Sequence, residues 1–93
     1  MKSVLQERKE CIVCATVLDL HCHHVFYGTA NRKRSERYGY KIWLCSRHHN
    51  MSDEGVHFNG GMALTLKQMA QEHFEENHGS RNDFIHEFGR SWL

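Results

Sequence analysis

The stretch that decides the fold runs from residue 11 to residue 57, and it begins with CIVC at residues 11–14. After an insert of 30 residues, the sequence CSRHHN follows at residues 45–50. A Cys-x-x-Cys turn supplies two ligands to a zinc ion, and Cys-x-x-His at the start of a helix supplies two more. The spacing therefore predicts a structural zinc site made of Cys11, Cys14, Cys45 and His48.

Two other interpretations of these cysteines are weaker. A redox pair of Cys11 and Cys14 would stand in a larger βαβ pattern, and the sequence contains no such pattern. His49 could replace His48 as the fourth ligand, but His48 repeats the spacing of the first half-site. The remaining cysteine, Cys22, lies in a predicted strand and is interpreted as a small buried side chain.

The length of 93 residues is that of one domain, and a chain this short needs an additional stabilising element such as a bound zinc ion. We expect a single domain over 1–93, with a zinc-bound core at 11–57 and C-terminal helices at 62–93. No apolar run approaches the roughly 18 residues that suggest a membrane span. The N-terminus also lacks the apolar stretch of a signal peptide. We therefore expect no membrane partner, a cytoplasmic location and reduced cysteines.

Hydrophobic periodicity and turn residues predict an α+β fold. The glycine pair at 60–61 is expected to interrupt regular secondary structure. Thr65 and Gln68 form a plausible capping box at the start of a helix that ends at Gly79. The other predicted elements are a strand within 16–24, a loop with at most a helical turn at 28–39, a strand at 40–44, a short helix from 45 and a last helix between Ser80 and Gly89.

The net charge of +1 hides an asymmetry between the two halves of the chain. Residues 1–50 carry nine lysines and arginines against four acidic residues, and residues 51–93 carry three against seven. The basic density is highest in the predicted loop, at Arg32, Lys33, Arg34 and Arg37. Such a run can hold the phosphates of a nucleic acid, although a solvated loop explains a short charge run equally well.

Nine histidines include two tandem pairs, His23-His24 at the end of the first predicted strand and His48-His49 at the start of the short helix. Neighbouring helix positions are about 100° apart, so His49 can face the strand while His48 faces the zinc ion. Imidazoles presented in this way could bind a second, catalytic divalent ion.

These residues resemble the HNH family of nucleases, also called the His-Me finger or ββα-metal group. The resemblance covers residues 11–57, about half of the chain, and rests on CIVC at 11–14, the tandem histidine at 23–24 and LCSRHHN at 44–50. The sequence is also similar to short HNH proteins of bacteriophages and prophages, with GVHFN at 55–59 part of that likeness. The resemblance implies a small zinc-stabilised treble-clef or ββα-metal finger with additional C-terminal helices. It also implies an endonuclease that hydrolyses DNA phosphodiester bonds with little sequence specificity.

Carried over by position, the resemblance implies that His24 is the general base and that His23 and His49 hold a catalytic Mg²⁺, Mn²⁺ or Ni²⁺ ion. His57 and Asp53 are alternatives for the third ligand. The basic run Arg32, Lys33, Arg34 and Arg37 would contact the DNA backbone. The family's middle asparagine is replaced by Tyr40, and His73, His78 and His86 are expected to take no part.

Two readings without catalysis compete with the nuclease: a zinc finger that binds nucleic acid and a zinc finger that binds protein. A monomer with one site would nick a single strand, so cleavage of both strands would imply a homodimer. Other phage proteins are partners that only the resemblance suggests.

Overall fold

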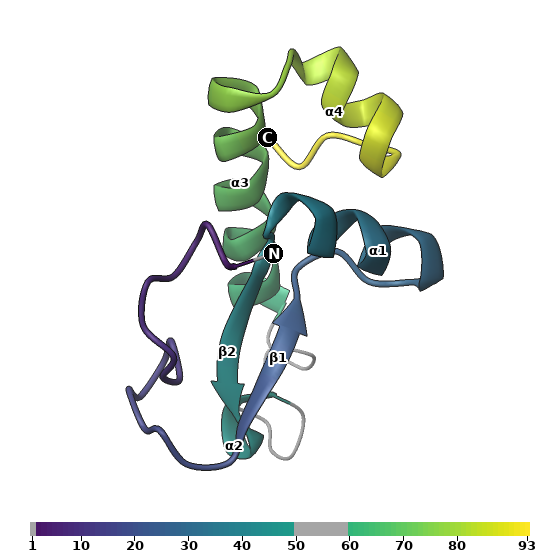
Figure 1. Ribbon diagram of the computed structural model, residues 1–93. Coiled ribbons are helices and arrows are strands. Elements are labelled where there is room, and N and C mark those ends of the chain that lie inside the picture. The colour runs from purple at the N-terminus through teal and green to yellow at the C-terminus, as the bar shows by residue number, and fades with distance from the viewer. Residues whose placement is uncertain (1, 50–59) are drawn as a thin grey trace.

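The computed structural model describes residues 2–49 and 60–93 and has the predicted α+β class (Figure 1). Among these residues, no helix combines the length and the apolar character that a membrane crossing requires. The elements are, in chain order, β1 (Leu20–His24), α1 (Thr29–Tyr38), β2 (Lys41–Cys45), α2 (Ser46–His49), α3 (Gly60–Asn77) and α4 (Arg81–Phe88).

The two strands form an antiparallel hairpin, and its register divides the side chains between two faces. His21 lies opposite Leu44 and His23 opposite Ile42, on what we call the core face, because Ile42 and Leu44 are almost fully buried. Successive strand residues point to opposite sides. The other side, which we call the outer face, therefore carries three cross-strand pairs: Leu20 with Cys45, Cys22 with Trp43 and His24 with Lys41.

The segment that connects the strands is a helix, α1, so the prediction of a loop at 28–39 is wrong. Alanine, arginine, lysine and glutamate are good helix formers, and no breaker interrupts the run between Gly28 and Gly39. Ser35 anchors the helix, because its buried hydroxyl donates to Phe26 O and accepts from Phe26 N, both at 3.1 Å. Gly39 ends α1 with φ +77°, where a Cβ atom would stand only 2.5 Å from Lys2 O.

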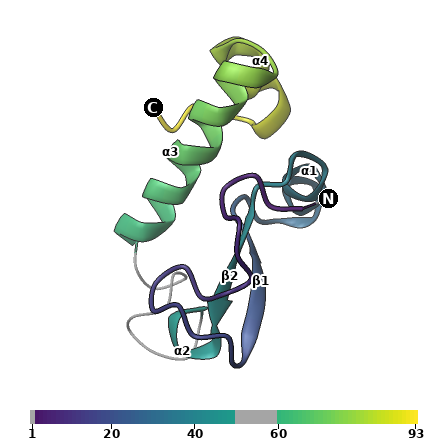
Figure 2. The same ribbon diagram turned by 60° about the vertical axis from the view of Figure 1, so that its left-hand side comes forward.

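The core joins the hairpin to the two C-terminal helices. Figure 2 shows α3 beginning near the hairpin and rising above it, with α4 folded back at the upper end of α3. The helices contribute three phenylalanines that pack edge-to-face or stacked at centroid separations of 4.9–6.4 Å, and Phe26 from the chain after β1 joins them. These three are Phe74, Phe84 and Phe88, and they are buried together with Leu66 and Ala70 of α3. Met69 and Ile85 of the same helices are more than one-third exposed.

The start of α3 differs from the prediction, whereas α4 agrees with it. α3 begins at Gly60, so the glycine pair lies within the helix rather than before it, and Thr65 also lies inside the helix. The Thr65 hydroxyl donates to Gly61 O at 2.9 Å, a hydrogen bond to the preceding turn that occupies it in place of capping. In α4, Ser80 and Asp83 form a reciprocal capping box and Gly89 ends the helix, as predicted.

The N-terminal segment, residues 2–10, runs along the free edge of β2 (Figure 1). Val4 N donates to Gly39 O at 3.0 Å, Ser3 Oγ donates to Lys41 O, and Trp43 N donates to Gln6 Oε1 at 2.8 Å. The segment therefore takes up hydrogen-bonding groups that an edge strand would otherwise leave open. It leads directly into the turn at residues 11–14.

Candidate metal centre and histidine cluster

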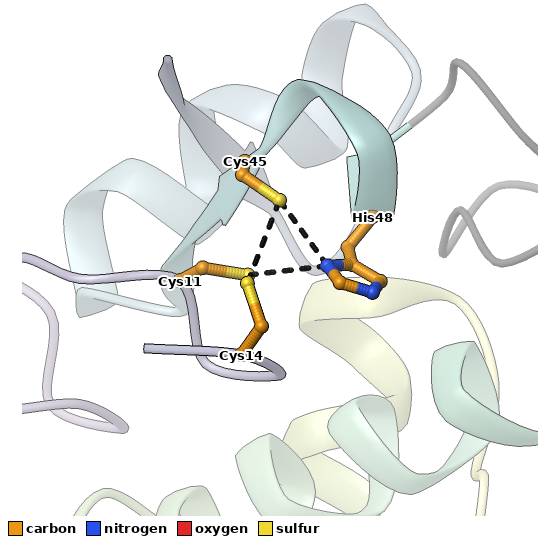
Figure 3. Close-up of side chains that lie close together, drawn as sticks. All are labelled: Cys11, Cys14, Cys45 and His48. Carbon is orange, nitrogen blue, oxygen red and sulfur yellow. Dashed lines mark hydrogen bonds between the residues drawn. The ribbon is translucent and has the colours of Figure 1, made fainter. Parts of the chain in front are cut away.

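The two cysteine half-sites come together at the end of the hairpin (Figure 3). Cys11 and Cys14 lie on a turn closed by a hydrogen bond from Ala15 N to Cys11 O at 2.8 Å, and Ala15 has φ +63°. Cys45 ends β2, and His48 lies on α2, which follows without a gap. A hydrogen bond from Ile12 N to Trp43 O at 3.0 Å fixes the turn against β2.

The distances between the four ligand atoms fit a tetrahedral metal ion. The Sγ atoms of Cys14 and Cys45 are 3.8 Å apart, and His48 Nδ1 lies 3.1 Å from Cys45 Sγ and 3.7 Å from Cys11 Sγ. Two thiolates at about 2.3 Å from one zinc ion would be about 3.8 Å apart, whereas a disulfide requires about 2.05 Å. The Cys₃His set is therefore arranged to hold a metal ion, and its donors are those of structural zinc sites.

The electrostatics of the thiols also favour a bound cation. Burial raises the pKa of Cys11, but backbone hydrogen bonds from Cys45, Cys14 and Val13 outweigh it and lower the pKa to about 6. For Cys14, a backbone hydrogen bond from Thr16 lowers the pKa, but burial and the neighbouring thiols of Cys11 and Cys45 together raise it. One thiolate forms readily and further ones are disfavoured beside it, so a cation at the centre would stabilise the full set.

The alternatives for the zinc ligands are now resolved. His48 is 8% exposed and faces the cysteines, whereas His49 turns toward β1, where its Nδ1 lies 3.1 Å from His21 Nδ1. Cys22 lies outside the cluster, on the outer face of β1, and is half-buried rather than fully buried. Burial is the main cause of its raised pKa.

The structure brings His23 and His49 together, as the sequence predicts, and adds His21. The ring of His49 lies 5.5 Å from that of His23 and 5.2 Å from that of His21, and all three belong to the core-face side of the hairpin. His23 is only 3% exposed. Within residues 2–49 and 60–93, the Cys₃His set is the one group of three or more His, Cys, Asp or Glu side chains whose ligand atoms all lie within 4.8 Å of one another. The proposed third ligands, His57 and Asp53, fall outside the described residues, as does the GVHFN segment.

His24 lies on the outer face, and its partner is an acid that the sequence analysis did not single out. His24 Nε2 is 2.8 Å from Glu36 Oε2, and the other carboxylate oxygen of Glu36 accepts from Lys41 Nζ at 2.7 Å. The hydrogen bond from Lys41, followed by that from His24, lowers the pKa of Glu36 to about 2, so the carboxylate is ionised at neutral pH. Tyr40, which stands at the position of the asparagine in the HNH pattern, does not take over its orienting task, because its buried hydroxyl contacts His73 Nδ1 at 3.1 Å.

Two signals in the sequence could have found the residues that were missed. His21 precedes His23 by two positions, and the period of two in a strand puts both on one face. Glu36 is the only acidic residue between positions 20 and 49, so it was the only local carboxylate for His24.

The basic run divides into two pairs on α1. Arg32 and Lys33 are exposed and line a hollow of about 720 Å³ together with His24, Glu36 and residues 27–29. Arg34 and Arg37 instead reach α4, where Glu87 Oε1 lies 3.7 Å from Arg34 Nε and 3.0 Å from Arg37 Nη1. The first pair is therefore the part of the run that adjoins His24.

The fold and this site define a small α+β domain with a β-hairpin, a following helix and a Cys₃His metal-binding cluster. Comparisons with protein-family models, curated proteins and solved structures gave no match to the chain. The resemblance to HNH nucleases therefore rests on the residues named above, and the activity it implies is a proposal.

Proposed function

We propose that the protein is a metal-dependent endonuclease of the HNH type that hydrolyses phosphodiester bonds in DNA. The observation that carries the proposal is the surroundings of His24. Its imidazole is held by an ionised carboxylate, and Arg32 and Lys33 line the same hollow. A general base beside cations that can hold a phosphate is what phosphodiester hydrolysis requires.

The contact with Glu36 assigns different tasks to the two nitrogens of His24. When Nε2–H donates to the carboxylate, Nδ1 keeps its lone pair and can take a proton from water. Glu36 would then stabilise the positive charge that His24 gains. This is the task of an orienting group beside a catalytic base, and it supplies the partner that Tyr40 cannot.

Phosphodiester hydrolysis is an in-line displacement, and its tasks would be divided between His24 and the pair His23 and His49. In such a reaction the attacking water and the departing 3′ oxygen lie on opposite sides of the phosphorus. His24 would take the proton from the attacking water, and His23 and His49 would hold the divalent ion. When bound, that ion supplies Lewis-acid stabilisation of the phosphate and the leaving oxygen. The 3.1 Å separation of His21 Nδ1 and His49 Nδ1 would suit two ligands of one ion, but His21, His23 and His49 do not together form a three-ligand group, so His57 and Asp53 stay the candidates for the third ligand.

Cleavage of supercoiled plasmid by the purified full chain tests the proposal. With Mg²⁺, Mn²⁺ or Ni²⁺ we expect nicked circles to accumulate, and excess chelator added just before the reaction should prevent this. DNA binding without cleavage by any of the three ions would favour the non-catalytic finger that binds nucleic acid. If the chain neither binds nor cleaves DNA, the finger that binds protein is favoured instead.

The two pairs of the basic run give a matched test of DNA binding. The double substitution Arg32→Gln, Lys33→Gln should weaken binding similarly on all sequences, because phosphate contacts do not read bases. The slope of log K against log salt should become shallower by about 1.8, or about 0.9 per lost contact. The control Arg34→Gln, Arg37→Gln should change this slope less, because Glu87 already pairs with both side chains. Equal slopes for the wild type and the Arg32, Lys33 variant would contradict a role for this pair.

A further inference from the structure

A cleft lies beside β2, against the N-terminal segment that runs along the strand edge. It encloses about 530 Å³, and Glu7 is the one acidic side chain among the described residues that line it. Cationic side chains that follow phosphates, combined with an aromatic ring on which a base can stack, are typical of sites for single-stranded nucleic acid. The lining has both features, in Trp43 and the cations Lys2, Arg8, Lys9 and Lys41.

The walls of this cleft are fixed to one another by hydrogen bonds. Trp43 N donates to Gln6 Oε1 at 2.8 Å, and Ile12 N donates to Trp43 O at 3.0 Å. Ser3 Oγ donates to Lys41 O. The cations of the N-terminal segment are therefore held at the same strand as the indole, which reduces the ordering cost of binding.

The ring of Trp43 stands on the outer face, next to a cation. Trp43 is half-buried, and Lys9 Nζ lies 4.6 Å from its ring centroid. The ammonium group stands over one face of the ring, so a base that stacks on Trp43 must displace it or take the other face, and Lys9 can then contact the attached phosphate. The pair therefore suits a whole nucleotide rather than a phosphate alone.

The cleft adjoins the hollow at His24. Lys41 lines the cleft, and its ammonium group contacts Glu36, which contacts His24 on the other side. Trp43 and Lys41 are two residues apart on β2, which corresponds to about 6.6 Å along a strand. A base at Trp43 and a phosphodiester at His24 can therefore belong to neighbouring nucleotides of one strand.

We propose that this cleft binds an unpaired nucleotide of a DNA strand, with its base stacked on Trp43 and its phosphates held by Lys2, Arg8 and Lys9. The base must be unpaired and unstacked, because the neighbouring bases of a duplex cover both of its faces. The preferred substrate is then DNA with a single-stranded segment next to the cleaved bond. This inference rests on the proposed function, since it takes the strand bound here to be the strand that His24 attacks.

The intrinsic fluorescence of Trp43 tests the proposal in the full chain. Trp92→Phe leaves Trp43 as the only tryptophan. Titration with an unlabelled 12-nucleotide DNA strand should quench its emission, and anisotropy of a dye-labelled copy should give an affinity higher than for the blunt duplex of the same sequence. In a chain with Trp92 intact, Trp43→Ala should weaken strand binding roughly 5- to 150-fold, the range expected for one stacked base. Trp43→Phe, which keeps a ring, should recover most of this loss.

Several results would overturn the proposal. One is strand binding in the anisotropy measurement without any change in Trp43 emission, and another is binding of the blunt duplex as tight as that of the strand, with the same quenching. Absence of strand binding, or tighter binding of the RNA strand of the same sequence, would have the same consequence. Zinc content equal to that of the wild type shows that a variant is folded. If Trp43→Ala does not fold, the quenching of Trp43 emission and the preference for the single strand, both measured without that substitution, provide the test.

The two proposals can fail separately. A chain that nicks plasmid but shows no Trp43 quenching retains the nuclease function and loses the nucleotide cleft. A chain whose Trp43 is quenched selectively by single-stranded DNA, but that never cuts, keeps the cleft as a binding site and loses the nuclease.

Discussion

Cys45→Ser is expected to abolish zinc binding and to unfold the domain at room temperature. Cys45 ends β2 and is 6% exposed, and its sulfur lies 3.8 Å from Cys14 Sγ and 3.1 Å from His48 Nδ1, so one metal ion could contact all three. Metal binding contributes roughly 10–16 kcal/mol to the folding of zinc-finger peptides. That is comparable with the whole stability of a domain, about 5–15 kcal/mol, and this chain has a small core.

Elemental analysis and circular dichroism measure the two effects. The wild type should retain about one zinc ion per chain after dialysis, as expected for one four-ligand site. Cys22→Ser is the matched control, because Cys22 is a half-buried cysteine of the same hairpin outside the cluster, and it should keep both the zinc and the fold. Cooperative unfolding at the wild-type temperature by a zinc-free Cys11→Ser, Cys45→Ser chain would contradict a structural metal site.

The metal cluster was predictable from the sequence because ligand spacing is a local property. Cys11-x-x-Cys14 fixes one turn and Cys45-x-x-His48 fixes one strand–helix junction, so only the meeting of the two was left to the fold. The ends of α4 were predictable for the same reason, because Ser80 and Asp83 cap a helix by contacts within one turn.

Errors occurred where a local pattern allowed two outcomes. The polarity of α1 suggested a loop, but a helix can be polar on most of its surface when a few contacts anchor it, here those of Ser35 and Tyr38. Thr65 and Gln68 have the spacing of a capping box, yet helix α3 extends through them to Gly60. The predicted strand at 40–44 begins and ends one residue before β2, which covers Lys41–Cys45.

The candidate site depends on contacts between distant segments, and the sequence predicted only some of these contacts. The facing of His23 and His49 followed from the cluster, since it holds α2 against the hairpin. The contact of His24 with Glu36 did not follow from the cluster, because it requires α1 to be a helix that places Glu36 at the outer face. The division of the basic run likewise requires α4, whose Glu87 pairs with Arg34 and Arg37.

His24→Ala is expected to reduce plasmid nicking by at least about 100-fold, because a general base contributes roughly 10²–10⁴-fold to a reaction. The measurement is the initial rate of nicking with saturating metal ion. Zinc content and affinity for DNA should stay near the wild-type values, since His24 is neither a ligand of the Cys₃His cluster nor a cation of the basic run. His86→Ala is the control, because this exposed histidine of α4 should leave the rate unchanged.

Glu36→Gln separates loss of the base from loss of its orienting partner. Glutamine removes the negative charge beside His24 but keeps the size of the side chain, so we expect a nicking rate between those of the wild type and His24→Ala. Glu36→Asp keeps the charge and should recover part of the rate. If His24→Ala nicks as fast as the wild type, His24 is not the base. If Glu36→Gln alone is unimpaired, the base acts without its carboxylate, and the contact between Lys41, Glu36 and His24 serves only to hold α1 against the hairpin.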